Sequence, residues 1–161
     1  MSKSVLLIDS CVRGECSRTL ALARQWLAEQ VPEARVEHLR LYELDLSPLP
    51  LEEVEARQDV SLARQFARAD EIVVAAPYWD LSFPAILKVY LERVCVTDVT
   101  FRYVGATPEG LCRAKRAVYV STAGGYVGDR HLGEEYVREL FRQLFGIPEF
   151  LTVRREGLDL P

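Results

Sequence analysis

Segments with strand patterning alternate with segments with helical patterning along the whole chain. Short branched apolar runs, which suit buried strands, occupy residues 4–9, 36–41, 71–76, 117–121 and 150–153. Between them, apolar residues recur at helical spacing over residues 19–31, 62–69, 83–96 and 132–145. Strict alternation of this kind predicts an α/β fold, in which one parallel sheet carries helices on both faces and the crossovers are right-handed.

The sequence predicts one domain over residues 1–161. A chain of 161 residues buries roughly 70% of its unfolded surface and can therefore hold a core without covalent staples. It contains no internal repeat, linker or low-complexity segment. We expect a doubly wound, flavodoxin-like sheet of five parallel strands in the order 2-1-3-4-5.

Charge and hydropathy exclude several classes of partner. Twenty basic against 24 acidic residues give a net charge of −4, whereas a nucleic-acid-binding chain would show a basic excess. The longest aliphatic run, Ile72–Ala76, is far too short to span a bilayer, and Val5–Ile8 is too brief for a signal-peptide core. We expect a soluble cytoplasmic protein that binds neither nucleic acid nor membranes.

The cysteines do not predict a metal site. None of the four forms a C-x-x-C pair, and neither histidine lies close to them in sequence. Their simplest role is that of small buried residues in a reducing compartment.

The chain ends shortly after the predicted fifth strand, with only residues 154–161 beyond it. A doubly wound sheet normally has a closing C-terminal helix there, and this pattern lacks one. We expect apolar side chains of the last strands to face water as a result, drawn from Val118, Val120, Phe150 and Leu151. Either the chain is a shortened form or a second copy covers this surface, which favours a homodimer.

Ligands of an open parallel sheet bind beyond the carboxyl ends of the strands, where the winding direction reverses. The loops that follow the first, third and fourth strands meet there. The first, residues 10–19, offers hydroxyls, a glycine, arginines and free backbone N–H groups at the start of a helix, which favours a phosphate. Simple capping of that helix by Ser17 is the alternative.

The second and third loops suit a flat ring. Residues 77–83 carry three aromatic side chains directly after a strand, which indicates an apolar ligand edge, although such residues also cap a core. Residues 121–126 are small and glycine-rich, so the backbone can approach a ligand closely, as it also does in an ordinary tight turn. Together the three loops predict flavin mononucleotide (FMN). The residues expected to bind it are Ser10, Cys16, Ser17, Arg18, Thr19, Pro77, Tyr78, Trp79, Asp80, Leu81, Ser121, Thr122, Ala123, Gly124 and Gly125.

Several segments resemble one known family. Residues 77–79, 83–88 (FPAILK) and 92–94 resemble the flavin-dependent NAD(P)H:quinone oxidoreductases. Residues 99–103, 108–111 and 121–125 resemble the bacterial azoreductase branch of that family. The resemblance covers nearly the whole chain, from Val5 to Gly157, and the PAILK segment is its most specific part.

This resemblance implies a flavodoxin-like fold, an FMN or FAD cofactor, a homodimer with the active site at the subunit interface, and ping-pong hydride transfer. NADH or NADPH would be the donor, and a quinone, an azo compound or a similar small electron-poor molecule the acceptor. Two segments depart from the azoreductase pattern. Tyr78–Leu81 replaces Met-Tyr-Asn-Phe, so Asp80 puts a carboxylate where an amide is expected. Cys16–Arg18 replaces Ser-Gln-Ser, so phosphate binding would depend on Ser17, Arg18 and Thr19.

Three residues are candidates for catalysis. Tyr126 and His131 are close enough in sequence to form a proton relay, with a solvated histidine at a helix start as the simpler alternative. Tyr103 would line the mouth of the pocket, and ordinary core packing is its alternative. Backbone donors near Gly124 and Gly125 would stabilise negative charge on the reduced flavin.

Three other functions compete with a reductase. A flavodoxin-like electron carrier would be more strongly acidic than this chain, so that it could dock redox partners. A low-molecular-weight phosphatase needs the spacing C-x5-R, but six residues separate Cys11 from Arg18, and no Asp-Pro pair supplies a general acid. A response-regulator receiver needs an aspartate at the end of the third strand, where Pro77 stands.

Overall fold

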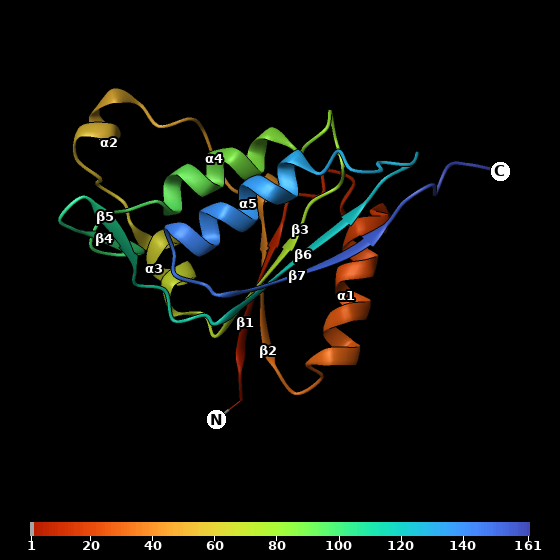
Figure 1. Cartoon of the computed structure of the whole chain (residues 1–161), viewed down its shortest axis with the longest axis horizontal. Coiled ribbons are helices and arrows are strands. Elements are labelled where there is room, and N and C mark those ends of the chain that lie inside the picture. The colour runs from red at the N-terminus through yellow and green to blue at the C-terminus, as the bar shows by residue number, and fades with distance from the viewer. Residues whose placement is uncertain (1) are drawn as a thin grey trace.

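The computed structural model describes residues 2–161. A five-stranded parallel sheet lies at its centre, in the order β2-β1-β3-β6-β7, with helices on both faces (Figure 1). The strands span Ser4–Asp9 (β1), Arg35–Arg40 (β2), Glu71–Ala75 (β3), Arg116–Thr122 (β6) and Glu149–Arg155 (β7). The predicted order 2-1-3-4-5 is confirmed, because β6 and β7 are the fourth and fifth strands of the prediction.

Burial explains why these segments form strands. All five residues of β3, and all but the first residue of β1 and of β6, are buried. Helices cover both faces of these three strands, so both faces need branched apolar side chains rather than an alternating pattern. β2 and β7 form the two edges of the sheet and are largely half-buried or exposed. The strand pattern is therefore clearest in the centre of the sheet.

The helices divide unequally between the two faces. Within residues 2–161, α1 (Arg18–Gln30) is the one α-helix on its face of the sheet, where it packs against Val5, Val73 and Val118. The other face carries α3 (Ser61–Arg68), α4 (Ala85–Val94) and α5 (Leu132–Gln143), which close over the larger apolar cluster. The sequence predicted the four long helices within two residues at each end. Within residues 2–161, no helix is both long and apolar enough to cross a membrane.

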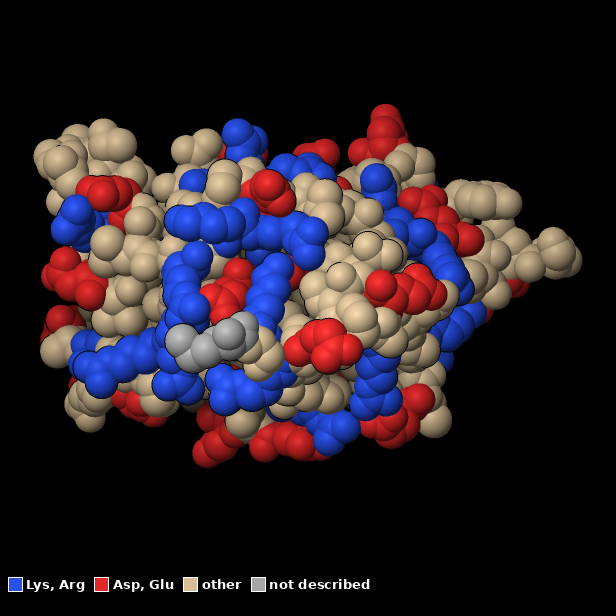
Figure 2. Space-filling model, turned by 90° about the horizontal axis from the view of Figure 1, so that it is seen from below, with Lys and Arg blue, Asp and Glu red and all other residues tan. Residues whose placement is uncertain are grey.

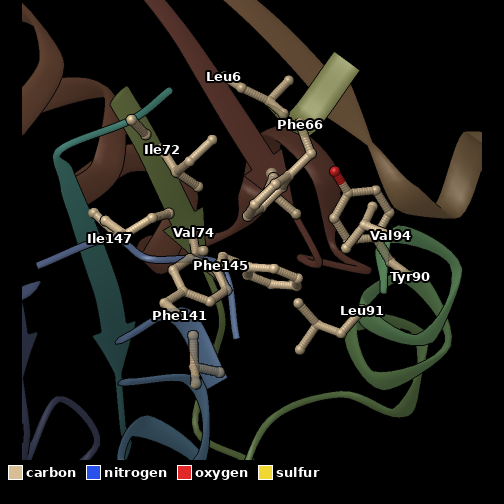
Figure 3. Close-up of a cluster of buried hydrophobic side chains, with 14 of the residues drawn as sticks. Leu6, Phe66, Ile72, Val74, Tyr90, Leu91, Val94, Phe141, Phe145 and Ile147 are labelled. Atoms are coloured by element: carbon tan, nitrogen blue, oxygen red, sulfur yellow. The ribbon is translucent and has the colours of Figure 1, made fainter. Parts of the chain in front are cut away.

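The larger cluster is built around aromatic rings (Figure 3). The Phe66 ring lies 5.5 Å from that of Phe141 and 4.8 Å from that of Phe145, measured between centroids. All three side chains are fully buried. Because they come from α3, α5 and the segment after α5, the cluster joins two helices that are far apart in sequence.

The expected exposure of the last strands is largely wrong. Val118 and Val120 are fully buried, because α1 lies over β6 as well as over β1 and β3. Phe150 points to the opposite face, where its ring stacks on Tyr119 at 6.3 Å. Only Leu151 is exposed as predicted, at 42%. The uncovered apolar surface is thus one side chain at the sheet edge and not a face of two strands.

A β-hairpin and a short α-helix were not predicted. An antiparallel hairpin joins β4 (Phe101–Val104) to β5 (Thr107–Gly110) between α4 and β6. Its turn places Gly105 at a φ of 63°, which a glycine adopts without steric cost. A short helix, α2 (Leu51–Glu55), follows the proline-containing loop 45–50. Neither carries the apolar periodicity by which the other elements were recognised.

The underside of the molecule, where the strands begin, is rich in lysine and arginine (Figure 2). Glu71, the first residue of β3, is fully buried there and pairs with Lys3 and with Arg116, whose Nε lies 2.6 Å from Oε1. The two cations compensate for the unfavourable free energy of removing this carboxylate from water.

Replacing Phe66 by alanine tests the aromatic cluster. The cavity left in a fully buried site should reduce the free energy of unfolding by about 3–5 kcal/mol, measured by urea denaturation. Leu51→Ala on the exposed α2 is the control, and its effect should stay within about 0.5 kcal/mol. An equal loss in both variants would contradict this description of the core.

Candidate active site

A cavity of about 230 Å³ opens at the carboxyl edge of the sheet. Its walls come from the three loops that the sequence indicated, at residues 11–19, 77–79 and 122–124, and from Asp159. Segments more than 100 residues apart in the chain therefore line one space. The convergence follows from the strand order, because β1, β3 and β6 are neighbours and end at the same edge.

The loop after β1 is held by a buried carboxylate. Asp9 accepts a 2.8 Å hydrogen bond from the amide of Cys11, and its second oxygen lies 2.8 Å from Nε2 of His38 on β2. The loop then turns at Gly14, with a φ of 52°, and Ser17 caps α1 by accepting from the amide of Leu20. The capping alternative for Ser17 is therefore realised in the structure.

Capping by Ser17 leaves the anion site intact. Within residues 2–161, the amides of Arg18 and Thr19, the first two of α1, have no hydrogen-bond partner. Free amides at the N-terminus of a 13-residue helix favour negative charge. Glu15 does not compete for this site, because it pairs with Arg24 and Arg40, which hold the pKa of its carboxyl at about 2.

Two other predicted phosphate ligands have partners within the protein. Ser10 is fully buried, donates to the carbonyl of Ala75 and does not line the cavity. The hydroxyl of Thr19 lies 2.7 Å from that of Thr122, so this pair joins the first loop to the third. Cys16 is exposed and lines the cavity.

The second loop supplies the aromatic wall through a tight turn. Trp79 and Ser82 exchange backbone hydrogen bonds of 3.1 and 2.7 Å, and the turn residues Asp80 and Leu81 have φ values of 50° and 66°. Residues other than glycine rarely adopt a positive φ, so the backbone of this turn is strained. Such a strained turn persists only where the surrounding structure holds it in place. Pro77, Tyr78 and Trp79 line the cavity, whereas Asp80 and Leu81 lie outside its lining.

The third loop brings backbone close to the cavity. Gly124 lies directly under the carboxylate of Asp159, so close that a Cβ atom there would meet Oδ2 at 2.0 Å and push this exposed side chain aside. Within the described residues, the amides of Gly124 and Gly125 have no hydrogen-bond partner. Ser121, Thr122 and Ala123 are buried. The loop can therefore donate two backbone hydrogen bonds to a ligand.

The three catalytic candidates do not come together in one chain. Tyr126 is 74% exposed, and no hydrogen bond joins it to His131 within residues 2–161. His131 instead contacts Arg154 and lies 3.8 Å from Glu156, beside a smaller cavity behind Tyr78. These contacts hold its ring at the start of α5.

Tyr103 is remote from the cavity. Its ring packs edge-on against Phe101 on the hairpin, with centroids 5.6 Å apart. The hairpin contacts the backbone of Gly146 through Gly110, beyond the C-terminal end of α5, whereas His131 precedes the N-terminal end of that helix. A role for Tyr103 at the pocket mouth would therefore require a second copy of the chain.

The phosphatase alternative requires a thiolate, and Cys11 does not supply one. Its side chain is buried, and burial raises the pKa of the thiol to about 12. The nucleophile of such an enzyme must instead be deprotonated near neutral pH. Within residues 2–161, no group of three His, Cys, Asp or Glu side chains could hold a metal ion.

Sequence reasoning missed Asp9, His38 and Asp159. A carboxylate that ends an otherwise apolar strand is a usable signal for Asp9. His38 pairs with it across β1 and β2, which only the strand register reveals. Asp159 reaches the cavity because the chain folds back after β7, and no local pattern predicts that.

Comparison with known proteins places this geometry in a family. A family model described as a flavodoxin-like fold matches residues 3–155. An FMN-dependent NADH:quinone oxidoreductase 2 of Clostridium acetobutylicum is 36% identical over an alignment 179 positions long, gaps included, which covers 99% of this chain and 88% of the relative.

Solved structures agree on the fold. An azoreductase from Bacillus anthracis superposes with a TM-score of 0.81 at 23% identity, over 98% of this chain and 88% of that one. An FMN-dependent NADH-azoreductase from the same species, solved in complex with FMN, gives a TM-score of 0.77 at 18% identity, over 100% and 90% of the two chains. The chain belongs to the flavodoxin-like family that includes the FMN-dependent NADH:quinone oxidoreductases.

Proposed function

We propose that the chain binds FMN in the cavity at the carboxyl edge and reduces quinones, azo compounds or similar electron-poor acceptors. One observation carries this proposal: the three loops that predicted a phosphate end, an aromatic wall and a backbone-rich wall line a single cavity. The names of the relatives favour FMN over FAD and NADH over NADPH. Bound flavin supplies the two-electron hydride chemistry, and the protein supplies position and electrostatics.

Each wall has a defined task in this proposal. The amides of Arg18 and Thr19 and the guanidinium of Arg18 hold the phosphate. Trp79, beside Pro77 and Tyr78, covers the ring. The amides of Gly124 and Gly125 donate to the pyrimidine edge, where they stabilise negative charge in the reduced state.

In this proposal, His131 and Tyr126 remain the candidates for proton transfer. Nε2 of His131 is held between Arg154 and Glu156, so the ring is oriented. The Tyr126 hydroxyl is exposed beside the same loop. No hydrogen bond joins the two groups within residues 2–161, so a proton passing between them would cross bound water or substrate.

We also propose that the protein acts as a cytoplasmic homodimer. Tyr103 and Val104, on the hairpin, are each 59% exposed, which is unusual for large apolar side chains at adjacent positions. In a dimer formed through the hairpin, Tyr103 serves as a pocket residue only if the interface sets the hairpin of one copy beside the cavity of the other. The four free cysteines suit a reducing compartment.

The absorbance spectrum of the purified protein, loaded with FMN, tests the flavin and the donor together. We expect the two visible bands of oxidised flavin, their loss on anaerobic addition of NADH, and their return on addition of a quinone. A protein that is yellow but not reduced by NADH would be an electron carrier. A protein that stays colourless after incubation with FMN would contradict the proposed cofactor.

Fluorescence of the two tryptophans tests the ring wall. Trp79 lines the cavity, whereas Trp26 lies on α1 with Arg116 over its ring at 5.6 Å. In a Trp26→Phe variant, where Trp79 is the remaining indole, we expect FMN to quench most of the emission, because quenching falls steeply with distance. The Trp79→Phe variant should be quenched less and should bind FMN more weakly. The reverse order would move the ring elsewhere.

Light scattering of dilute protein tests the dimer and its surface. The wild type should scatter with twice the mass of one chain, and the variant Tyr103→Ser/Val104→Ser should shift towards the monomer, since it removes apolar area worth about 25 cal/mol per Å². Leu151→Ser is the matched control at the sheet edge and should remain dimeric. A monomeric wild type that oxidises NADH at full rate would refute the proposal, and dissociation by Leu151→Ser alone would move the interface to β7.

A further inference from the structure

Residues 156–160, which we call the C-terminal strap, fold back from β7 across the glycine-rich loop. Three consecutive amides of the strap, at residues 157–159, donate hydrogen bonds of 2.9–3.2 Å to the carbonyl groups of residues 123–125. Within residues 2–161, the amides of Gly124 and Gly125 stay free, whereas the amide of Ala123 donates to the carbonyl of Arg155 and that of Val127 to the carboxylate of Glu156. The strap therefore adds to the edge of the cavity without filling the backbone donors that a flavin needs.

The strap places one carboxylate in the cavity. Oδ1 of Asp159 lies 2.8 Å from Nη1 of Arg18, and Oδ2 lies over Gly124, where a Cβ atom would meet it at 2.0 Å. The hydrogen bond from Arg18 lowers the pKa of Asp159, and the charge of Arg13 lowers it further. The carboxylate is thus ionised at neutral pH and faces the arginines of the first loop.

We propose that Asp159 occupies the place of the flavin's terminal phosphate at Arg18, so that a phosphorylated flavin binds only when this carboxylate moves aside. The inference rests on the proposed function, because it takes Arg18 and the start of α1 as the phosphate site. The carboxylate of Asp159 and the phosphate would repel each other if both were bound to the guanidinium of Arg18. The N-terminus of α1 favours the phosphate, because the phosphate carries more negative charge.

The contact is weak enough to be displaced. The side chains of Arg18 and Asp159 are 47% and 66% exposed, and exposed ion pairs contribute little stability. The phosphate can therefore replace the carboxylate, at the cost of the ion pair. Riboflavin lacks the phosphate and does not need Arg18, so Asp159 lowers the preference of the site for FMN over riboflavin.

Flavin-fluorescence titrations of the wild type and of Asp159→Asn, with FMN and with riboflavin, test the inference. Asparagine keeps the shape and removes the charge. We expect FMN to bind about 1.5- to fivefold more tightly to the variant, the range that an exposed ion pair allows, and riboflavin to bind with unchanged affinity. The gain in FMN affinity should disappear when Arg18→Ala is already present.

A charge-matched control separates this contact from a change in net charge. Asp129 is exposed near the same loop and forms no ion pair within residues 2–161. Asp129→Asn should leave FMN affinity unchanged, and a gain equal to that of Asp159→Asn would overturn the inference. The conservative variant Asp159→Glu, which keeps the charge, should not gain affinity.

The remaining outcomes separate the two proposals. If the wild type binds FMN and Asp159→Asn binds it equally or more weakly, Asp159 orients Arg18 for the phosphate, and the inference is overturned while the proposed function stands. If no variant binds either flavin, the proposed function fails, and this inference fails with it.

Discussion

The pairing of β1, β3 and β6 is the constraint on which the rest of the structure depends. These neighbouring parallel strands are almost entirely buried, and their backbone groups are satisfied by one another and by the edge strands β2 and β7. Because these strands are hydrogen-bonded in a fixed parallel register, their carboxyl ends lie side by side. The loops after them must meet at one edge, so the site arises from the sheet and not from affinity between the loops.

Local pattern was sufficient for the parts of the fold that depend on burial. The central strands and the long helices are recognisable because their apolar spacing repeats. The hairpin β4–β5 shows no such repeat: its register pairs Arg102 with Glu109 and Tyr103 with Pro108, and Gly110 lies directly against the backbone of Gly146. A close backbone contact with a distant residue carries no periodic signal.

The position of the candidate site was also predictable from the sequence, but the contacts of its side chains were not. Loop positions follow from strand order, so most of the predicted cavity residues do line it. What each side chain contacts is a separate matter. Ser10 and Thr19 carry hydroxyls that suit a phosphate, yet one bonds to the neighbouring strand and the other to Thr122. Val118 and Val120 were expected to face water because the sequence does not show how far α1 extends across the sheet.

The turn at Trp79–Ser82 links the shape of this site to the robustness of the whole chain. Leu81 has a positive φ, a conformation that costs a non-glycine residue roughly 1–2 kcal/mol. Packing of the buried strands compensates for that strain. The strain of the turn and any destabilising mutation in the core therefore both reduce the same free energy of unfolding. A lineage that accumulates destabilising changes would come under selection to place glycine at position 81. Glycine at position 81 would relieve the strain but would hold Trp79 and its neighbours less rigidly. The residue at position 81 is therefore subject to two opposed requirements, the stability of the fold and the rigidity of the aromatic wall.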